Sequence, residues 1–278
     1  MIASFLIYVS LLASWNNLRS QYAHDAAASL QVISQAVQNF AAEKQRLPAN
    51  ITAKDGKPLL SWRVELLPYL EQNALYQQFK NDEPWDSPNN RPLVEKIPAV
   101  FTPGQASTWA SRLDPQRLSR PAGNTCFQGF VGPGTAWQHG KPVSLADIAA
   151  KDGLPNTILL IDGGTTVPWT KPEDLAYDPA GPLPPLGGLY VKSHAVVALG
   201  DGTIVAVRPD AEQSQLRTFI TYDDGQSGER DAVFGGLPKP EEGWFSVVVA
   251  WGPFAGGTAL AIIFLVVLLR WWMVMADG

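Results

Sequence analysis

The apolar residues between positions 18 and 45 recur at helical spacing. They follow one another at intervals of three or four positions, as on one face of an α-helix, and are Ala26, Leu30, Ile33, Val37 and Phe40. Pro48 comes shortly afterwards and favours the end of a helix there. The pattern predicts an amphipathic helix over 19–48 that packs this face against a domain. Joined to the apolar run before it, such a helix is about 65 Å long at about 1.5 Å per residue.

Both ends of the chain are apolar. Residues 1–15 and 247–269 contain no charged side chain, and a membrane-spanning helix needs about 20 predominantly apolar residues. We therefore expect an N-terminal transmembrane anchor over 1–18 and a C-terminal transmembrane helix over 244–272. For the first run, a cleaved signal peptide and a buried helix are the alternatives. Arg270 directly follows the second run, so the positive-inside rule places the C-terminus in the cytoplasm and the middle of the chain outside it.

The segment from 61 to 93 joins many apolar residues to an acidic turn bounded by prolines. Ser61 is suited to cap a short helix over 62–67, and Pro68 is suited to begin a second one. Asn73 is predicted to cap the turn that follows. The prolines between 81 and 105 rule out long regular structure there.

The acidic turn holds the carboxylates with which the chain could bind a metal ion. Asp82, Glu83 and Asp86 are oxygen donors of the kind that Ca²⁺ prefers, but their spacing is not that of an EF-hand loop. We predict a solvated turn in which Asp86 accepts backbone hydrogen bonds, with a calcium site as the alternative. Trp62 and Trp85 are predicted to be the buried anchors of this region.

The rest of the middle region alternates short apolar runs with turn residues. The predicted elements are a strand over 125–131, a helix over 142–148 capped by Ser144, a strand over 157–161 ended by the Asp-Gly-Gly at 162–164, a helical turn at 171–174, a helix over 211–221 and a flexible linker over 223–243. Two β-rich runs, 190–199 and 203–207, flank Asp201 and Gly202. Asp-Gly between such runs is a strong hairpin signal, so both residues are predicted to form the turn.

These elements predict an α+β fold. A long N-terminal helix packs on a small antiparallel β-sheet, and a C-terminal transmembrane helix follows. The extracytoplasmic domain is expected to span 49–222.

Charge and cysteine content narrow the possible functions. The 278-residue chain has a formal net charge of −5, and nucleic-acid binding proteins instead cluster Lys and Arg. We therefore expect no nucleic-acid partner. Cys126 is the single cysteine, which excludes an internal disulfide and is typical of a buried free thiol.

No familiar catalytic motif is present. His24, His139 and His194 lack metal-ligand spacing. The sequence contains no G-x-S-x-G elbow and no phosphate-binding glycine loop, and the GQSG at 225–228 lies in the predicted linker. We expect no catalytic residues, no metal and no cofactor.

Several unusual strings occur in a fixed order along the middle of the chain: WRVELLPYLEQNALYQQFKNDEPWDSPNN, FVGPGTAW, NTILLIDGGTTVPWTKPEDLAYDP, LGG and ALGDGTIVAV. Together they resemble a large planctomycete family of unknown function with a prepilin-like or pseudopilin-like N-terminus, of the H-X9-DG processing-associated class. The resemblance covers about residues 25–210. It implies a pilin-like fold similar to that of type IV pilins and type II secretion pseudopilins, with a long N-terminal helix on a small sheet.

The resulting hypothesis is a non-catalytic, pseudopilin-like protein of the inner (cytoplasmic) membrane whose main domain is extracytoplasmic. Its role would be structural or interactive within the cell envelope or secretion machinery, and its partners would be the membrane and other envelope proteins. A membrane-anchored ligand-binding sensor domain is the alternative, and an envelope hydrolase is a third hypothesis. A deep pocket with convergent polar groups would favour the last two.

Overall fold

The computed structural model describes residues 2–102, 121–138, 140, 142–187, 195–226 and 228–238, with side chains from Ser20 onwards. Residues Asn17–Lys239 form one compact unit, and the fold below is that of this unit. The boundaries predicted from the sequence for the regions of the chain stay predictions. The predicted C-terminal transmembrane helix, 244–272, lies outside the described residues.

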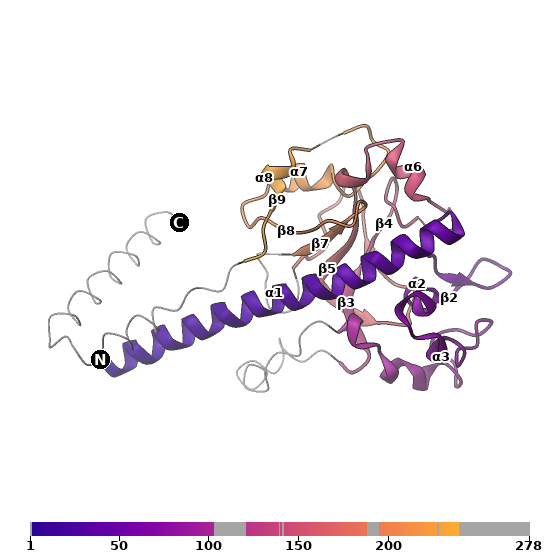
Figure 1. Ribbon diagram of the computed structural model, residues 1–278, viewed down its shortest axis with the longest axis horizontal. Coiled ribbons are helices and arrows are strands. Elements are labelled where there is room, and N and C mark those ends of the chain that lie inside the picture. Colours follow the sequence, from indigo (N-terminus) through magenta and orange to yellow (C-terminus); the bar gives the residue numbers. More distant parts are fainter. Residues whose placement is uncertain are drawn as a thin grey trace. The chain divides into compact units, whose positions relative to one another are not determined.

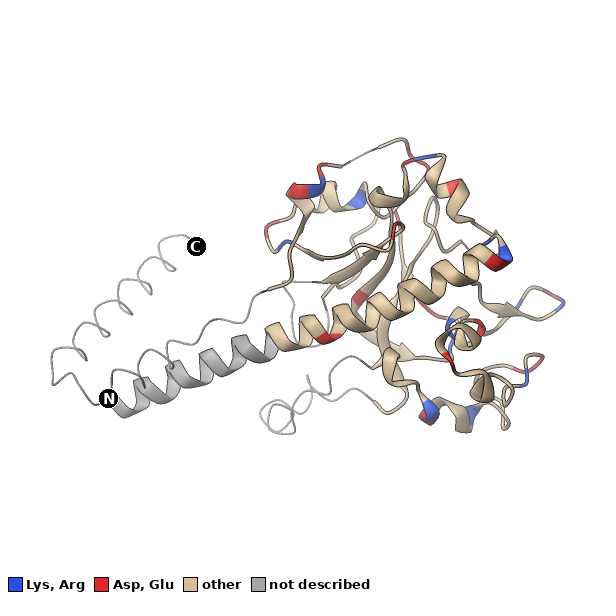
Figure 2. Cartoon of the chain, viewed as in Figure 1, with Lys and Arg blue, Asp and Glu red and all other residues tan. Residues whose placement is uncertain are grey.

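The N-terminal element is one continuous helix, α1 (Ile2–Lys44). The prediction of its buried face is confirmed, since all five apolar residues of the stripe, Ala26, Leu30, Ile33, Val37 and Phe40, are buried. The opposite face carries Gln31, Gln35 and other exposed residues. Charged side chains are sparse along the described part of α1 and lie mostly on the loops and short helices around the sheet (Figure 2).

A five-stranded antiparallel sheet forms the centre of the domain. Its strands lie in the order β3 (Asn124–Gln128), β5 (Ile158–Pro168), β7 (Val196–Leu199), β8 (Ile204–Val207) and β9 (Phe234–Gly235). Each neighbouring pair is antiparallel. Helix α1 runs across one face of the sheet, and α7 (Gln213–Arg217) and α8 (Arg230–Val233) lie beyond the other (Figure 1).

The alternation of side chains along the strands divides the core in two. In β7, Val196 and Ala198 point into the core beneath α1, whereas Val197 and Leu199 point into the core beneath α7 and α8. This is the period of two expected of a strand buried on both faces. The sheet is therefore the middle layer of three.

A β-bulge in β5 breaks that alternation at one point. The pairing of β5 with β7 shifts between Ile158 and Leu160, and the consecutive residues Leu159 and Leu160 both belong to the core beneath α1. A bulge sets two residues against one on the partner strand. The extra residue lets β5 place one more leucine beneath the helix.

Shorter elements surround the sheet. They are β1 (Ile51–Thr52), β2 (Pro58–Leu60), α2 (Trp62–Glu65), α3 (Asn73–Tyr76), β4 (Phe130–Val131), α6 (Leu145–Ala149), β6 (Leu175–Ala176) and the 3₁₀-helices η1 (Leu67–Leu70), η2 (Arg91–Lys96), η3 (Ala99–Phe101) and η4 (Leu154–Asn156). Ser61 caps α2, Pro68 lies at the start of η1, and Ser144 caps α6 through a capping box, all as predicted. Asn73 does not cap α3, because the helix already begins at that residue.

The predicted fold class is wrong. Within the stretches that the structure describes, no helix combines the length and the apolarity needed to cross a membrane. This finding contradicts the pilin-like arrangement in which the N-terminal helix begins in the membrane. The predicted C-terminal span lies outside the residues to which this finding applies. The described fold is α+β around the five-stranded antiparallel sheet, and α1 buries a single apolar stripe against it.

Two strand predictions also need correction. The strand predicted over 125–131 divides into β3 and β4 at Gly129, where a Cβ would collide with the Trp137 ring. The strand predicted to end at 162–164 continues to Pro168. A Cβ on Gly164 would lie 2.9 Å from the backbone of Pro185. This glycine therefore permits the close approach of another segment of the same chain and is not a turn residue.

Three further segments differ from their predictions. The segment at 171–174 leads into β6 and forms no helix. The segment predicted to be a linker contains α8 and β9 in its described part, and β9 adds the fifth strand to the sheet. Helix α7 is also shorter than the helix predicted over 211–221.

Candidate functional site

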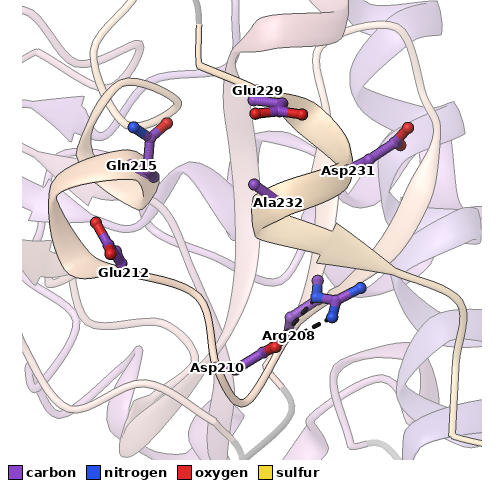
Figure 3. Close-up of a pocket in the computed structure, with 7 residues that line it drawn as sticks. All are labelled: Arg208, Asp210, Glu212, Gln215, Glu229, Asp231 and Ala232. Carbon is purple, nitrogen blue, oxygen red and sulfur yellow. Dashed lines mark hydrogen bonds and ion pairs between the residues drawn. The ribbon is translucent and has the colours of Figure 1, made fainter.

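A charged pocket of about 510 Å³ lies between α7 and α8. Its lining consists of Arg208, Asp210, Glu212, Gln215, Glu229, Asp231 and Ala232. Figure 3 shows Glu212 and Gln215 on one side of the opening, Glu229 and Ala232 on the other, and the Arg208–Asp210 pair below them. All seven residues are exposed, so the pocket is open to solvent.

One backbone hydrogen bond and one ion pair at the end of β8 position the base of the pocket. The Arg208 N–H donates to the Val233 carbonyl at 2.8 Å, which ties the end of β8 to the end of α8. The Arg208 guanidinium donates from Nε to Asp210 Oδ1 and from Nη2 to Asp210 Oδ2, both at 3.1 Å. This two-point contact holds the guanidinium and the carboxylate in one orientation.

The walls come from the starts of two short helices. Glu212 immediately precedes α7, and its Oε2 accepts a hydrogen bond from Ser214 Oγ at 3.4 Å. Glu229 immediately precedes α8, and Asp231 lies in the first turn of that helix. Val233 and Phe234 are buried beneath these side chains and hold the second wall to the sheet.

Negative charge dominates the pocket. Four carboxylates and one guanidinium line it, so its formal charge is 1 − 4 = −3. The hydrogen bond from Arg208 lowers the pKa of the Asp210 carboxyl, which keeps it ionised at neutral pH. Arg208 is bound to Asp210, and Figure 3 shows Asp231 pointing away from Glu212. The carboxylates of Glu212 and Glu229 are therefore the ones placed to attract a cationic group of a ligand.

The predicted metal candidates do not form a site. Asp82 and Asp86 are exposed and Glu83 is partly exposed. Across the described ranges, no group of three or more His, Cys, Asp or Glu side chains is arranged to hold a metal ion. Glu83 instead accepts two hydrogen bonds from Asn89 Nδ2, at 2.8 and 3.0 Å.

The acidic turn is organised around a residue that the sequence analysis missed. Asn90 is fully buried, and its Nδ2 donates to the carbonyls of Lys80, Glu83 and Pro84 at 2.9, 3.1 and 3.1 Å. Its Oδ1 accepts from the Lys80 N–H at 2.9 Å. The hydrogen bonds expected of Asp86 thus come from Asn90.

The two predicted tryptophan anchors differ in burial. Trp62 is buried, whereas Trp85 is only partly buried against the same core. Trp62 stacks at a tilt on Trp137, with ring centroids 4.7 Å apart. Lys171 Nζ lies 5.9 Å from the Trp85 ring centroid, so Trp85 also contacts a surface cation.

A buried ion pair is the second feature, after Asn90, that the sequence analysis did not predict. Arg63 Nη2 lies 2.7 Å from Asp174 Oδ1, and the two side chains are 0% and 2% exposed. Asp174 also accepts from Trp62 Nε1 at 3.1 Å and from the Gly129 N–H at 3.0 Å. Arg63 donates to the Phe127 carbonyl from Nε at 3.1 Å and from Nη2 at 2.7 Å.

This pair cross-links the domain and is closed to ligands. Burial raises the pKa of the Asp174 carboxyl, while the facing Arg63 and the Gly129 N–H act in the opposite direction. The network joins α2 to β3 and to the segment before β6, and it is shielded from solvent. No sequence motif marks either residue, since each stands among ordinary apolar and polar neighbours.

The remaining predicted residues have local roles or lie outside the described part. Asp201 Oδ1 accepts from the Thr203 N–H at 2.9 Å, and Gly202 adopts a φ of 85°, within the hairpin that joins β7 and β8. His24 Nδ1 lies 2.8 Å from the Ser20 carbonyl. His139 and His194 lie outside the described residues.

The comparisons with known proteins give one match. A family model described as a protein of unknown function (DUF1559) matches residues 28–224. No curated protein matches the chain, and no solved structure matches it. The match ends before Glu229, so one wall of the pocket lies beyond the matched segment.

Proposed function

The chain belongs to the DUF1559 family of unknown function, and we propose that it is a non-catalytic interaction domain that receives a cationic group of a partner protein in the pocket between α7 and α8. The observation that carries this proposal is the lining of that pocket, with four carboxylates against one guanidinium. A structural or interaction role in the cell envelope, expected from the sequence, belongs to the same proposal.

The size and lining of the pocket favour a protein partner over a small apolar ligand. Its volume of about 510 Å³ falls within the range of small-molecule sites, roughly 300–1,000 Å³, but such sites are mostly apolar and enclosed. Ala232 is the one apolar residue among the seven that line this pocket. The long side chain of a lysine or arginine could place its charge between Glu212 and Glu229 while its own chain stayed outside.

The electrostatics set the strength of such an interaction. Exposed charge pairs contribute about 0.2–1 kcal/mol each, and salt screens them over about 10 Å at 0.1 M. Two glutamates therefore account for about 0.4–2 kcal/mol, a factor of about two to thirty in the dissociation constant. The proposed interaction is weak and depends on salt.

The test uses the purified full chain and a hexalysine peptide, with hexaglutamate as the opposite-charge probe. We expect hexalysine to bind more tightly than hexaglutamate in titration calorimetry at low salt. The double variant Glu212→Gln/Glu229→Gln should bind hexalysine about two- to thirty-fold more weakly. A matched variant, Glu71→Gln/Glu95→Gln, changes two other exposed glutamates and should bind like the unaltered chain. If both double variants lost the same affinity for hexalysine, the overall charge of the protein would explain the binding. The proposed role of the pocket would then be wrong.

The location of the domain outside the cytoplasm is also a proposal and has its own test. Cys126 is the single cysteine and is buried, so the unaltered chain should resist a membrane-impermeant maleimide. Gln31 is exposed on α1, and Gln31→Cys should be labelled in intact cells if the domain faces outward. Labelling that appears only after cell lysis would show that the domain faces the cytoplasm.

A further inference from the structure

The chain after β6 is rich in proline, and residues 182–185 are Pro-Leu-Pro-Pro. Proline fixes its own φ at about −65° and favours an extended conformation for the residue before it. Three of these four residues are prolines, and Leu183 precedes one. No peptide bond of the described ranges is cis. The four residues, called the proline strip below, are therefore suited to the polyproline II conformation.

The burial of the strip and of the residue after it repeats with the period of that conformation. Polyproline II has about three residues per turn, so residues three apart share a face. Leu183 and Leu186 are partly buried and pack against the core beneath α7 and α8. Pro182 and Pro185 are exposed. One face of the segment thus holds it to the domain, and the next face presents two prolines to solvent.

Hydrogen bonds fix the proline strip at both ends. Before the strip, the Arg217 guanidinium donates to the carbonyl of Asp178 at 3.2 Å and to that of Gly181 at 2.5 Å. At its last residue, the Gly164 N–H donates to the Pro185 carbonyl at 3.0 Å. The strip is therefore held in place by α7 and β5 before any partner binds. Such preorganisation lowers the entropy cost of association.

The backbone of the strip has acceptors to offer and almost no donors. No backbone N–H of the described ranges donates to the carbonyls of Pro182, Leu183 or Pro184. Proline has no N–H of its own, so the strip cannot pair with a partner strand through a regular ladder of hydrogen bonds. A partner would instead contact the proline rings and donate to the carbonyls between them.

We propose that the proline strip docks into a groove lined by aromatic side chains on a partner protein. Such grooves recognise two prolines spaced P-x-x-P in the polyproline II conformation, which is the spacing of Pro182 and Pro185. Residues 179–187 contain no charged side chain, so the interaction should depend little on salt. The charged pocket plays no part in it, and the inference does not rest on the proposed function.

The test is titration calorimetry of the purified full chain with two domains that have aromatic-lined grooves, an SH3 domain and a WW domain. We expect at least one of them to bind. The double variant Pro182→Ala/Pro185→Ala should bind it about fivefold more weakly or worse, because a few anchor residues carry most of the binding energy of an interface. The matched variant Pro142→Ala/Pro155→Ala changes two other exposed prolines and should bind like the unaltered chain.

A second measurement leaves this chain unaltered. The binding domain with its groove aromatic residues replaced by alanine should no longer bind. The inference is wrong if neither domain binds at millimolar concentration, or if the two double variants lose the same affinity. It is also wrong if Pro182→Ala/Pro185→Ala lowers the stability in urea but leaves the binding unchanged, because the prolines would then only stiffen the chain after β6.

Discussion

Removal of the Asp174 carboxylate should strongly destabilise the domain. Asp174→Ala leaves Arg63 charged at 0% exposure and removes the acceptor of the Trp62 and Gly129 N–H groups. Breaking a buried ion pair by removing one partner costs about 3–5 kcal/mol. A domain is stable by only about 5–15 kcal/mol in total, so this single change should remove a large fraction of that stability.

The assay is equilibrium unfolding of the purified full chain in urea, followed by circular dichroism at two protein concentrations. The free energy of unfolding comes from linear extrapolation, and an unchanged dependence on urea would show that the unfolded state is unaltered. Glu173→Ala is the matched control. Glu173 is the neighbouring acidic residue, but it pairs with Lys171 at the surface with side chains 48% and 39% exposed. An exposed pair of this kind contributes at most about 1 kcal/mol.

A double-mutant cycle separates the pair from the general cost of altering a core. Each single variant, Arg63→Met or Asp174→Leu, leaves the other charged side chain buried without its partner. The double variant removes both charges. The double variant should therefore be more stable than the sum of the single effects predicts, with a coupling of about 0.5–3 kcal/mol. Additive effects, or a cost below about 1 kcal/mol for Asp174→Ala, would refute the assignment of this pair as a cross-link of the core.

Four other substitutions, in two pairs, test the segment from 61 to 93. Asn90→Ala leaves a buried cluster of backbone groups without their partner and should cost at least about 1–3 kcal/mol in urea unfolding, whereas Asp86→Ala, at an exposed position, should cost less than about 0.5 kcal/mol. Trp62→Ala should cost about 3–5 kcal/mol and Trp85→Ala clearly less, because only Trp62 is fully buried. Melting curves that rank the two tryptophans in the opposite order would contradict the burial argument.

The sequence predicted correctly those elements that depend on interactions between residues close together in the chain. The stripe on α1 repeats with the helical period, and every residue of it is buried. Ser144 caps α6 because its hydroxyl accepts the Asp147 N–H at 3.1 Å, an interaction within four consecutive residues. The hairpin at Asp201 and Gly202 follows from the φ of 85° that the glycine adopts without strain. None of these needs information from elsewhere in the chain.

The features that were missed depend on contacts between distant positions. Arg63 and Asp174 are 111 positions apart, and charged residues are rarely buried unless paired. No local pattern distinguishes Asp174, whose side chain is 2% exposed, from the exposed Glu173 beside it. The Asp-Gly-Gly at 162–164 predicts the end of a strand because glycine favours turns, yet Gly164 serves to let Pro185 approach closely. The same residue type serves both purposes, so the sequence alone cannot separate them.

Two buried apolar residues fix the position of the polar segment that forms one wall of the charged pocket. The stretch after Asp223 is polar enough to predict a linker, but Val233 and Phe234 are buried in the core beneath α7 and α8. Their burial adds β9 to the sheet and brings Glu229 opposite Glu212. The pocket then holds a formal −3, from one basic and four acidic residues, within a chain whose total is −5. A field concentrated at one opening attracts a cation there more strongly than the same charge spread over the surface, which is why the binding test contrasts these two glutamates with two placed elsewhere.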